Sequence, residues 1–199
     1  MGKPMLHVLS TGRQSIDTLV DINKQIHPFT DYLHIREKNW TTKQIENVVS
    51  LMLQEGVPRE KIIVNGHPSI AKAYSLAGVH YPEAVPIDVR KQRLLVGSSV
   101  HSEPTARERV ADGVDYLFFG HIFATKSKEG IMPRGLAALR RMAYAVDCPI
   151  IAIGGIHPEN VQACLAYQAQ GVAVMSGIYE KENPLERVKD YDRALREGI

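Results

Sequence analysis

Cysteine, charge of one sign and long apolar runs are all scarce in this chain. Only two of its 199 residues are cysteines, Cys148 and Cys164, and their spacing suits neither a disulfide framework nor a zinc site. Lysine and arginine number 24 against 22 aspartates and glutamates, with no basic stripe, which argues against nucleic-acid binding. No apolar run reaches the length of a membrane span or a secretory signal. We therefore expect a cytoplasmic protein with reduced cysteines and with neither a membrane nor a nucleic-acid partner.

Short runs of apolar and β-branched residues recur along the chain and alternate with segments of helical periodicity. The runs lie at 5–11, 31–37, 61–66, 77–81, 94–99, 115–120, 149–155 and 171–177. A doubly wound open sheet is the alternative architecture, but eight consecutive repeats in so short a chain favour closure. The pattern predicts a single (β/α)₈ barrel domain over residues 1–199. The least convincing helices are 13–27, which could be partly loop, and 86–92, which is barely two turns.

Polar residues gather at the predicted C-terminal ends of the strands, where the loops of such a barrel build its active site. The second to the sixth strands end near a set of basic, amide and hydroxyl side chains: His34, Arg36, Lys38, Asn65, His80, Ser99, His101 and His121. The last two strands end in Gly154-Gly155 and in Ser176-Gly177. Glycines let an anion approach backbone N–H groups closely, and loops seven and eight of this fold often hold a phosphate. The four residues predict a phosphate site.

Five segments together carry a resemblance to a known family. "YLHIREK", "GSSVHS", "VDYLFFGHIFATKSKEG", "PIIAIGGI" and "GVAVMSGI" resemble the thiamin phosphate synthase superfamily and cover almost the whole chain. The resemblance implies a (β/α)₈ barrel. It also implies one of two activities. The synthases join a hydroxymethylpyrimidine pyrophosphate to a thiazole phosphate with Mg²⁺, whereas a sister group, TenI, consists of thiazole tautomerases that were once described as regulators.

The chain departs from the synthase pattern where the synthases bind metal. The family's aspartate after strand three is replaced by Gly66 and the following arginine by His67. The second aspartate, after strand four, aligns with Ala84, beside which Glu83 supplies one displaced carboxylate. Since Mg²⁺ wants carboxylates together with phosphate oxygens in octahedral order, Glu83 alone makes a poor site. We expect no metal ion and no cofactor.

A third departure falls at the end of strand six. Synthases carry a proline after the glycine there, whereas this chain has His121 in "GHIF", as the tautomerase group does. Proline can neither donate nor accept a proton, but an imidazole does both near neutral pH. The resemblance therefore implies a tautomerase that aromatises a carboxy-methyl-thiazolylidene ethyl phosphate, with His121 as the catalytic acid–base group.

The remaining matched positions imply substrate contacts. Arg36 and Lys38 match the family's Arg-x-Lys and suit a carboxylate or phosphate, unless Arg36 instead pairs with Glu37 or Glu83. Further substrate-binding residues are expected at matched positions after strands three, five and six, namely Asn65, Ser99, His101 and Lys128. His34, in phase with Arg36, is predicted to face the barrel interior, and His7, His27 and His157 to be structural or exposed.

Other functions stay open at this point. A synthase-like transferase is the alternative within the superfamily, and a non-enzymatic regulator that binds a thiazole phosphate is another. Direct gene regulation is disfavoured because no helix-turn-helix is visible. A metal-dependent hydrolase would require a close His-x-His pair or an aspartate after strand eight. The sequence has neither, since strand eight ends in "VMSG". We also expect a possible homo-oligomer and a lid formed by the loop 122–134, with Trp40 as a further candidate lid residue.

Overall fold

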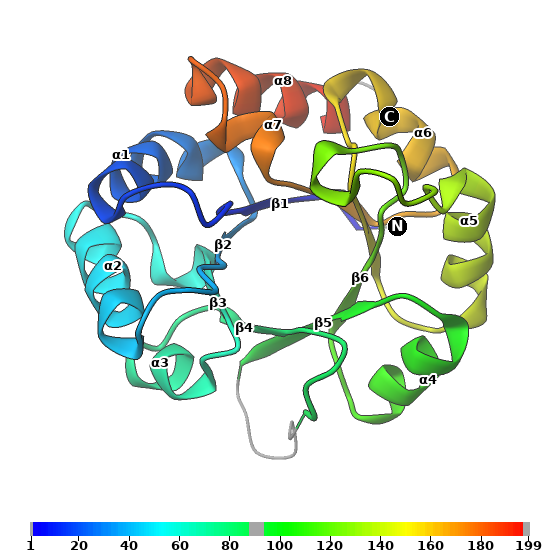
Figure 1. Cartoon of the computed structure of the whole chain (residues 1–199), viewed down its shortest axis with the longest axis horizontal. Coiled ribbons are helices and arrows are strands. Elements are labelled where there is room, and N and C mark those ends of the chain that lie inside the picture. Colours follow the sequence, from blue (N-terminus) through cyan, green and yellow to red (C-terminus); the bar gives the residue numbers. More distant parts are fainter. Residues whose placement is uncertain (1, 88–93, 197–199) are drawn as a thin grey trace.

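Eight parallel strands form one closed barrel in the computed structural model, which describes residues 2–87 and 94–196 (Figure 1). Each strand pairs with the next along the chain, and β8 closes the ring against β1. The strands are β1 (Met5–Leu9), β2 (Tyr32–Ile35), β3 (Ile62–Asn65), β4 (Gly78–Tyr81), β5 (Leu95–Val100), β6 (Tyr116–Gly120), β7 (Ile150–Ile153) and β8 (Gly171–Val174). The predicted closed barrel is confirmed, and the open-sheet alternative is wrong.

Helices surround the barrel. They are α1 (Ile16–Ile26), α2 (Thr42–Gln54), α3 (Pro68–Ala73), α4 (Glu103–Ala111), α5 (Gly135–Ala145), α6 (Pro158–Ala166), α7 (Ser176–Tyr179) and α8 (Pro184–Arg196), with 3₁₀ turns η1 (His27–Phe29), η2 (Arg59–Lys61) and η3 (Lys126–Lys128). The doubtful segment 13–27 is mostly the helix α1, whereas most of the weak helix at 86–92 lies outside the described residues. Within 2–87 and 94–196, every helix is too short or too polar to cross a bilayer.

Local sequence explains where several helices begin. The hydroxyl of Thr41 accepts a hydrogen bond from the N–H of Gln44, and the side-chain oxygen of Gln44 accepts one from the N–H of Thr41. This capping box satisfies two backbone donors that α2 would otherwise leave unpaired. Pro158 occupies the first turn of α6, where its missing N–H costs nothing.

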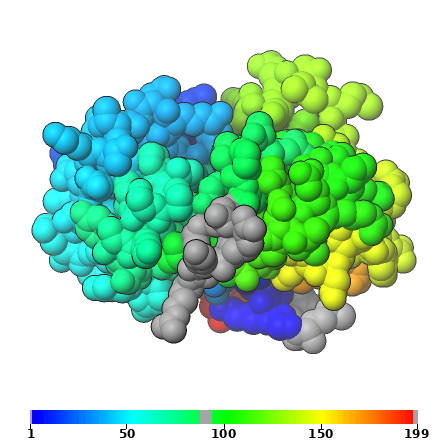
Figure 2. Space-filling view, turned by 90° about the horizontal axis from the view of Figure 1, so that it is seen from below, coloured from blue at the N-terminus to red at the C-terminus, as the bar shows by residue number. Residues whose placement is uncertain are grey.

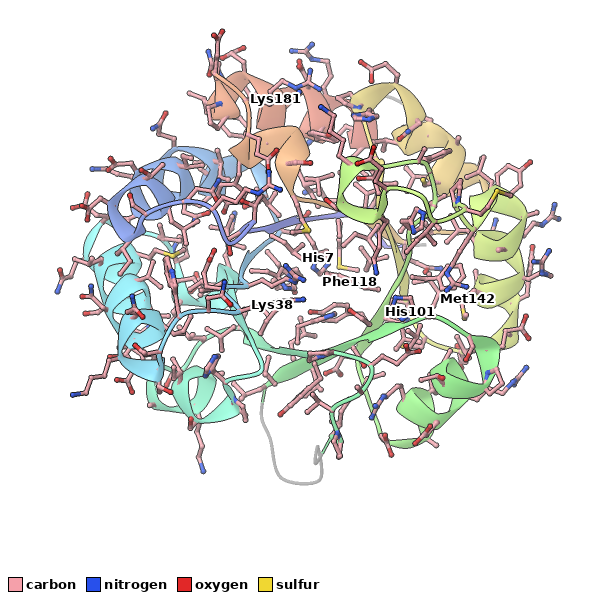
Figure 3. All side chains as sticks on the ribbon, in the orientation of Figure 1. His7, Lys38, His101, Phe118, Met142 and Lys181 are labelled. Atoms are coloured by element: carbon pink, nitrogen blue, oxygen red, sulfur yellow. The ribbon has the colours of Figure 1, made fainter. Side chains whose placement is uncertain are left out.

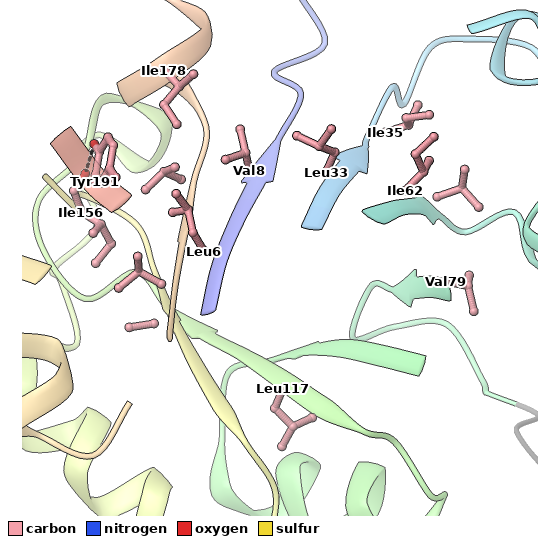
Figure 4. Packing of buried hydrophobic residues seen from close by; sticks show 14 of the residues in the cluster. Leu6, Val8, Leu33, Ile35, Ile62, Val79, Leu117, Ile156, Ile178 and Tyr191 are labelled. Carbon is pink, nitrogen blue, oxygen red and sulfur yellow. Dashed lines mark hydrogen bonds between the residues drawn. The ribbon is translucent and has the colours of Figure 1, made fainter. Parts of the chain in front are cut away.

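Alternation along the strands divides the buried side chains into two cores. One fills the barrel interior and includes Leu9, Ile63, Tyr116, Phe118 and Ile151. The larger one lies between the strands and the helices, where residues such as Val8, Leu33 and Leu117 pack outward (Figure 4). The barrel interior also contains buried histidine rings, and their hydrogen bonds reach residues at the C-terminal mouth of the barrel.

The segment after β6 stands out from this mouth. In Figure 2 its yellow-green atoms project at the end of the molecule opposite the first residues of the chain. Ile131 and Met132 at its tip expose 58% and 86% of their surface. At its base, Arg134 N–H donates to the carbonyl of His121 and Gly135 N–H to that of Ile122. The predicted lid segment is thus an exposed excursion tied down at both ends; its movement stays a prediction.

Close strand packing makes Gly78 a point of tight constraint. An added Cβ there would lie 2.0 Å from the backbone carbonyl oxygen of Leu95, its partner in β5. We expect Gly78→Ala to lower the free energy of unfolding by about 2 kcal/mol, because β4 and β5 must separate to make room. Urea unfolding at neutral pH measures it. Gly2→Ala, at a site with nothing within 4 Å, is the matched control, and equal stability of the two variants would contradict the packing argument.

Candidate active site

Three histidines lie inside the barrel around one phenylalanine. The ring of Phe118 has its centroid 4.3 Å from that of His80, 5.2 Å from that of His34 and 5.3 Å from that of His7. Viewed down the barrel, His7 and Phe118 lie within the ring of strands (Figure 3). His34 faces the interior, as predicted, and His7 is structural rather than exposed. Sequence alone left His80 undecided, although its phase in β4 is the one that points inward.

Hydrogen bonds join two of these histidines to a predicted site residue. His7 Nδ1 lies 2.9 Å from His34 Nε2, and His34 Nδ1 lies 3.3 Å from the side-chain oxygen of Asn65. Asn65 is the last residue of β3 and is half-buried at the mouth. The other ring nitrogen of His7, Nε2, is buried and has no hydrogen-bond partner among the described residues.

A second chain of contacts leads to another predicted site residue. His80 Nε2 lies 2.9 Å from the hydroxyl oxygen of Ser99, and His80 Nδ1 lies 3.2 Å from the hydroxyl of Tyr116. Tyr116 is 2% exposed and Ser99 is half-buried near the end of β5. His80 and Tyr116 were not predicted as site residues; the signal that finds them is their inward phase, shared with Asn65 and Phe118.

Burial keeps the interior imidazoles neutral. Desolvation lowers the pKa of His34 to about 3, although its hydrogen bond to Asn65 works against the shift. Desolvation, followed by the neighbouring imidazoles and, for His80, by Arg36, places the pKa values of His7 and His80 well below the ordinary value. None of the three is therefore the cationic imidazolium at neutral pH, the form that would act as a general acid.

His121 stands apart from this group, directly after β6. It is 8% exposed, and the peptide bond from Gly120 to His121 is cis. Its Nε2 lies 3.2 Å from the carbonyl oxygen of Ile131, in the predicted lid segment. Since a carbonyl only accepts, Nε2 carries a hydrogen, and in the neutral ring the lone pair is on Nδ1. That Nδ1 has no hydrogen-bond partner in the described part of the chain, so it is free to accept a proton.

Both carboxylate oxygens of Glu83 form hydrogen bonds with His101. Its carboxylate accepts hydrogen bonds from the backbone N–H of His101 at 2.8 Å and from the ring Nδ1 at 2.6 Å. Burial alone would raise the pKa of Glu83, but these bonds together hold it below its ordinary value. The pair links the loops after β4 and β5, and the sequence did not predict it. The side chain of His101, labelled in Figure 3, is exposed.

The predicted basic residues differ in their surroundings. Arg36 is half-buried, and among the described residues it forms no ion pair with Glu37 or Glu83, so the predicted alternative of a salt bridge is not found there. Burial lowers the pKa of Arg36, while Glu37 opposes the shift. Glu37 instead accepts a hydrogen bond from the N–H of Gly12. Lys38 and Lys128 are exposed, with Lys128 in η3.

The predicted phosphate residues lie at neighbouring strand ends. Gly154 and Gly155 follow β7 with φ of 94° and 67°. Close approach also requires glycine here, since a Cβ on Gly155 would lie 2.5 Å from the carbonyl oxygen of Ala124. Ser176 and Gly177 form the first turn of α7, whose N–H groups have no partner within the helix. Phosphate binding at this edge stays a prediction.

The site residues therefore fall into separate groups around the mouth. Asn65 and Ser99 flank β4 and are each backed by an interior histidine. His121 lies against Gly154, where an added Cβ would come within 2.3 Å of the His121 Cβ. No hydrogen bond in the described residues joins His121 to the other predicted site residues, so only a ligand spanning the mouth would connect the groups.

The comparisons with known proteins identify the family. A family model described as thiamine monophosphate synthase matches residues 7–178. The chain belongs to this family. It is 31% identical over 174 residues to a thiamine-phosphate synthase of Pyrococcus furiosus, covering 84% of this chain and 83% of that one. A thiamine-phosphate synthase of Pyrococcus horikoshii is 27% identical over 197 residues, covering 95% of this chain and 94% of the other.

Solved structures support the same architecture. A thiamine phosphate pyrophosphorylase from Pyrococcus furiosus superposes with a TM-score of 0.80 at 24% identity, covering 99% of this chain and 98% of that one. At this identity the likeness shows the fold, here the (β/α)₈ barrel of the family.

Mg²⁺, which the family resemblance implies for synthases, does not fit the residues present. The first carboxylate position holds Gly66, with φ of 77°, and the second holds the exposed Ala84. Both oxygens of the adjacent Glu83 already accept hydrogen bonds from His101. No carboxylate pair faces the mouth at these positions.

Buried neutral histidines make the free energy of unfolding depend on pH. With a pKa of about 3 folded against 6.5 unfolded, His34 binds fewer protons in the native state between those values. Stability must therefore fall as pH drops below 6.5, by up to about 1.4 kcal/mol per pH unit for each such histidine. We expect His34→Gln to reduce the slope by ~1 kcal/mol per unit between pH 6 and pH 5.

Urea unfolding at several pH values measures the slope. The matched control is His157→Gln, the same substitution at an exposed histidine outside the barrel. An unchanged slope in His34→Gln would contradict a neutral His34.

Proposed function

We propose that this member of the family is a thiazole tautomerase. The observation that carries the proposal is the placing of His121: a largely buried imidazole at the mouth, whose Nε2–H is held by the carbonyl of Ile131 and whose Nδ1 is free. Such a group can take up and release a proton at one nitrogen. The residues at the metal positions, Gly66 and Ala84, favour a reaction of this kind over pyrophosphate displacement.

The proposed substrate is a carboxy-methyl-thiazolylidene ethyl phosphate. His121 Nδ1 removes the proton from ring carbon 2, and the C–H electron pair moves through the ring toward the exocyclic double bond. The imidazolium then gives the same proton to the exocyclic carbon, which leaves an aromatic carboxythiazole ethyl phosphate and a neutral His121. Atoms and charge balance without a second reactant. The Ile131 carbonyl stabilises the imidazolium by accepting its Nε2–H.

The anionic groups of the substrate suit the rest of the mouth. We assign the phosphate to the N–H groups around Gly154, Gly155, Ser176 and Gly177. Arg36 is favoured for the carboxylate, because a guanidinium binds it with two parallel hydrogen bonds, with Lys38 as a further cation. Asn65, Ser99 and His101 would contact the ring and its substituents, and Lys128 would attract the anion from the loop after β6.

A second candidate is the transferase reaction of the synthases. The names of the relatives favour it, since those cited above are thiamine-phosphate synthases. Gly66, Ala84 and the pairing of Glu83 with His101 weigh against it, because these three positions offer no free carboxylate to hold the ion that balances a departing pyrophosphate. A phosphate-binding protein without catalysis is the third outcome of the test below.

Replacing His121 tests the tautomerase proposal. We expect His121→Gln to lower kcat by ~10²–10⁴-fold while product affinity changes little, because the variant loses its proton acceptor but keeps a polar side chain. Aromatic absorbance after mixing with the unaromatised substrate measures the rate. His157→Gln is the control. Turnover by His121→Gln equal to that of the wild type would refute the role of this residue.

The same preparation separates the three functions. Incubation with the pyrimidine pyrophosphate, the thiazole phosphate and Mg²⁺ reports synthase activity through released pyrophosphate. Aromatisation without pyrophosphate release supports the tautomerase. Pyrophosphate release supports the synthase, and binding of the thiazole phosphate without acceleration of either reaction supports a sensor.

A further inference from the structure

Two chains of buried hydrogen bonds end at the mouth, and their proton positions follow from what each atom can donate. Tyr116 is enclosed, and His80 Nδ1 is the sole hydrogen-bond partner of its hydroxyl in the described residues. If Nδ1 carried the hydrogen, the buried Tyr116 O–H would have no acceptor, which a folded interior avoids. The hydroxyl must therefore donate to Nδ1.

That direction fixes the rest of the chain. A neutral imidazole carries one hydrogen, so a His80 that accepts at Nδ1 donates from Nε2. Burial, with a pKa well below the ordinary value, keeps His80 neutral. The Nε2–H donates to the Ser99 oxygen at 2.9 Å, which leaves the Ser99 hydroxyl hydrogen free to point elsewhere. Among the described residues, no other acceptor contacts that hydroxyl.

The second chain has the same direction. The oxygen of Asn65 accepts from His34 Nδ1, so His34 Nε2 must accept from His7 Nδ1. His7 Nε2 is then a bare lone pair, which agrees with its lack of a partner, since an unpaired acceptor is tolerated better than an unpaired N–H. Asn65 is left with its amide hydrogens at the mouth. Both chains therefore begin inside the barrel and end in a donor.

We infer that Tyr116 and His80 are positioning residues that fix Ser99 as a hydrogen-bond donor, so that Ser99 and Asn65 together select a ligand with acceptor atoms on the face between β3 and β5. The ligand class is an anion or heterocycle that offers a carboxylate oxygen or an unprotonated ring nitrogen. The identity of the ligand, but not the direction of the chains, rests on the proposed function.

The proton positions are open to direct measurement in the ligand-free protein. In histidine labelled with ¹⁵N, long-range ¹H–¹⁵N correlations distinguish the two neutral tautomers. We expect the Nε2–H form for His80 and the Nδ1–H form for His34, the His80 signals being those that His80→Asn lacks. An Nδ1–H tautomer or a charged ring for His80 at neutral pH would overturn the inference.

Tyr116→Phe tests the hydrogen bond to His80 Nδ1. Without the hydroxyl this nitrogen has no donor, so we expect its ¹⁵N resonance to move toward that of a bare lone pair, while the ring keeps its Nε2–H because a buried unpaired acceptor costs less than a buried unpaired N–H. The control is Tyr32→Phe, which removes a hydroxyl from the ring 4.9 Å from His7; the Tyr32 hydroxyl has no hydrogen bond within the described residues, so the His80 pattern should not change. An unaltered His80 in Tyr116→Phe would remove Tyr116 from the chain.

Binding of the aromatic carboxythiazole ethyl phosphate tests the consequence. We expect Ser99→Ala and His80→Leu each to raise Kd about tenfold, the size of one lost hydrogen bond to a charged group, and the double variant to be no worse than either. Additive losses would contradict a shared chain. If the wild type does not bind this probe, the proposed ligand is wrong, while the tautomer of His80 still decides the direction of the chain.

Discussion

Burial of three imidazoles in a closed barrel is the constraint on which the site depends. An imidazole removed from water loses its charge, and once neutral its N–H needs an acceptor, whereas a lone pair can stay unpaired, as in His7. Inside the barrel His80 and His34 find partners in Tyr116, Ser99 and Asn65. The need to satisfy rings in the interior thus determines what Ser99 and Asn65 offer to a ligand at the mouth.

This division of labour separates two kinds of histidine. His34 and His80 are sealed in, and their role is to orient side chains rather than to exchange protons. His121 lies at the rim, in contact with a loop rather than with the interior, and keeps one nitrogen free. A barrel with many histidines therefore offers one that suits acid–base chemistry, together with donors at the ends of β3 and β5.

Much of this could be predicted from the sequence, because the strand pattern and the family motifs are local. The barrel and the inward face of His34 both follow from short-range periodicity. The link between Glu83 and His101 could not be predicted, since it joins two loops and depends on the register of β4 against β5. Nor could the partners of His80, because a histidine in a strand shows its phase but not which hydroxyl meets it.

The close contact at Gly154 bears on how such a site can change during evolution. The atoms that exclude a side chain there are the Cβ and Cα of His121, at 2.3 and 2.7 Å. Every residue has a Cα, and every residue except glycine has a Cβ. The demand for glycine at 154 therefore comes from the path of the backbone and not from the imidazole. Position 121 is free to exchange one chemistry for another by a single substitution, while the neighbouring strand end stays as it is.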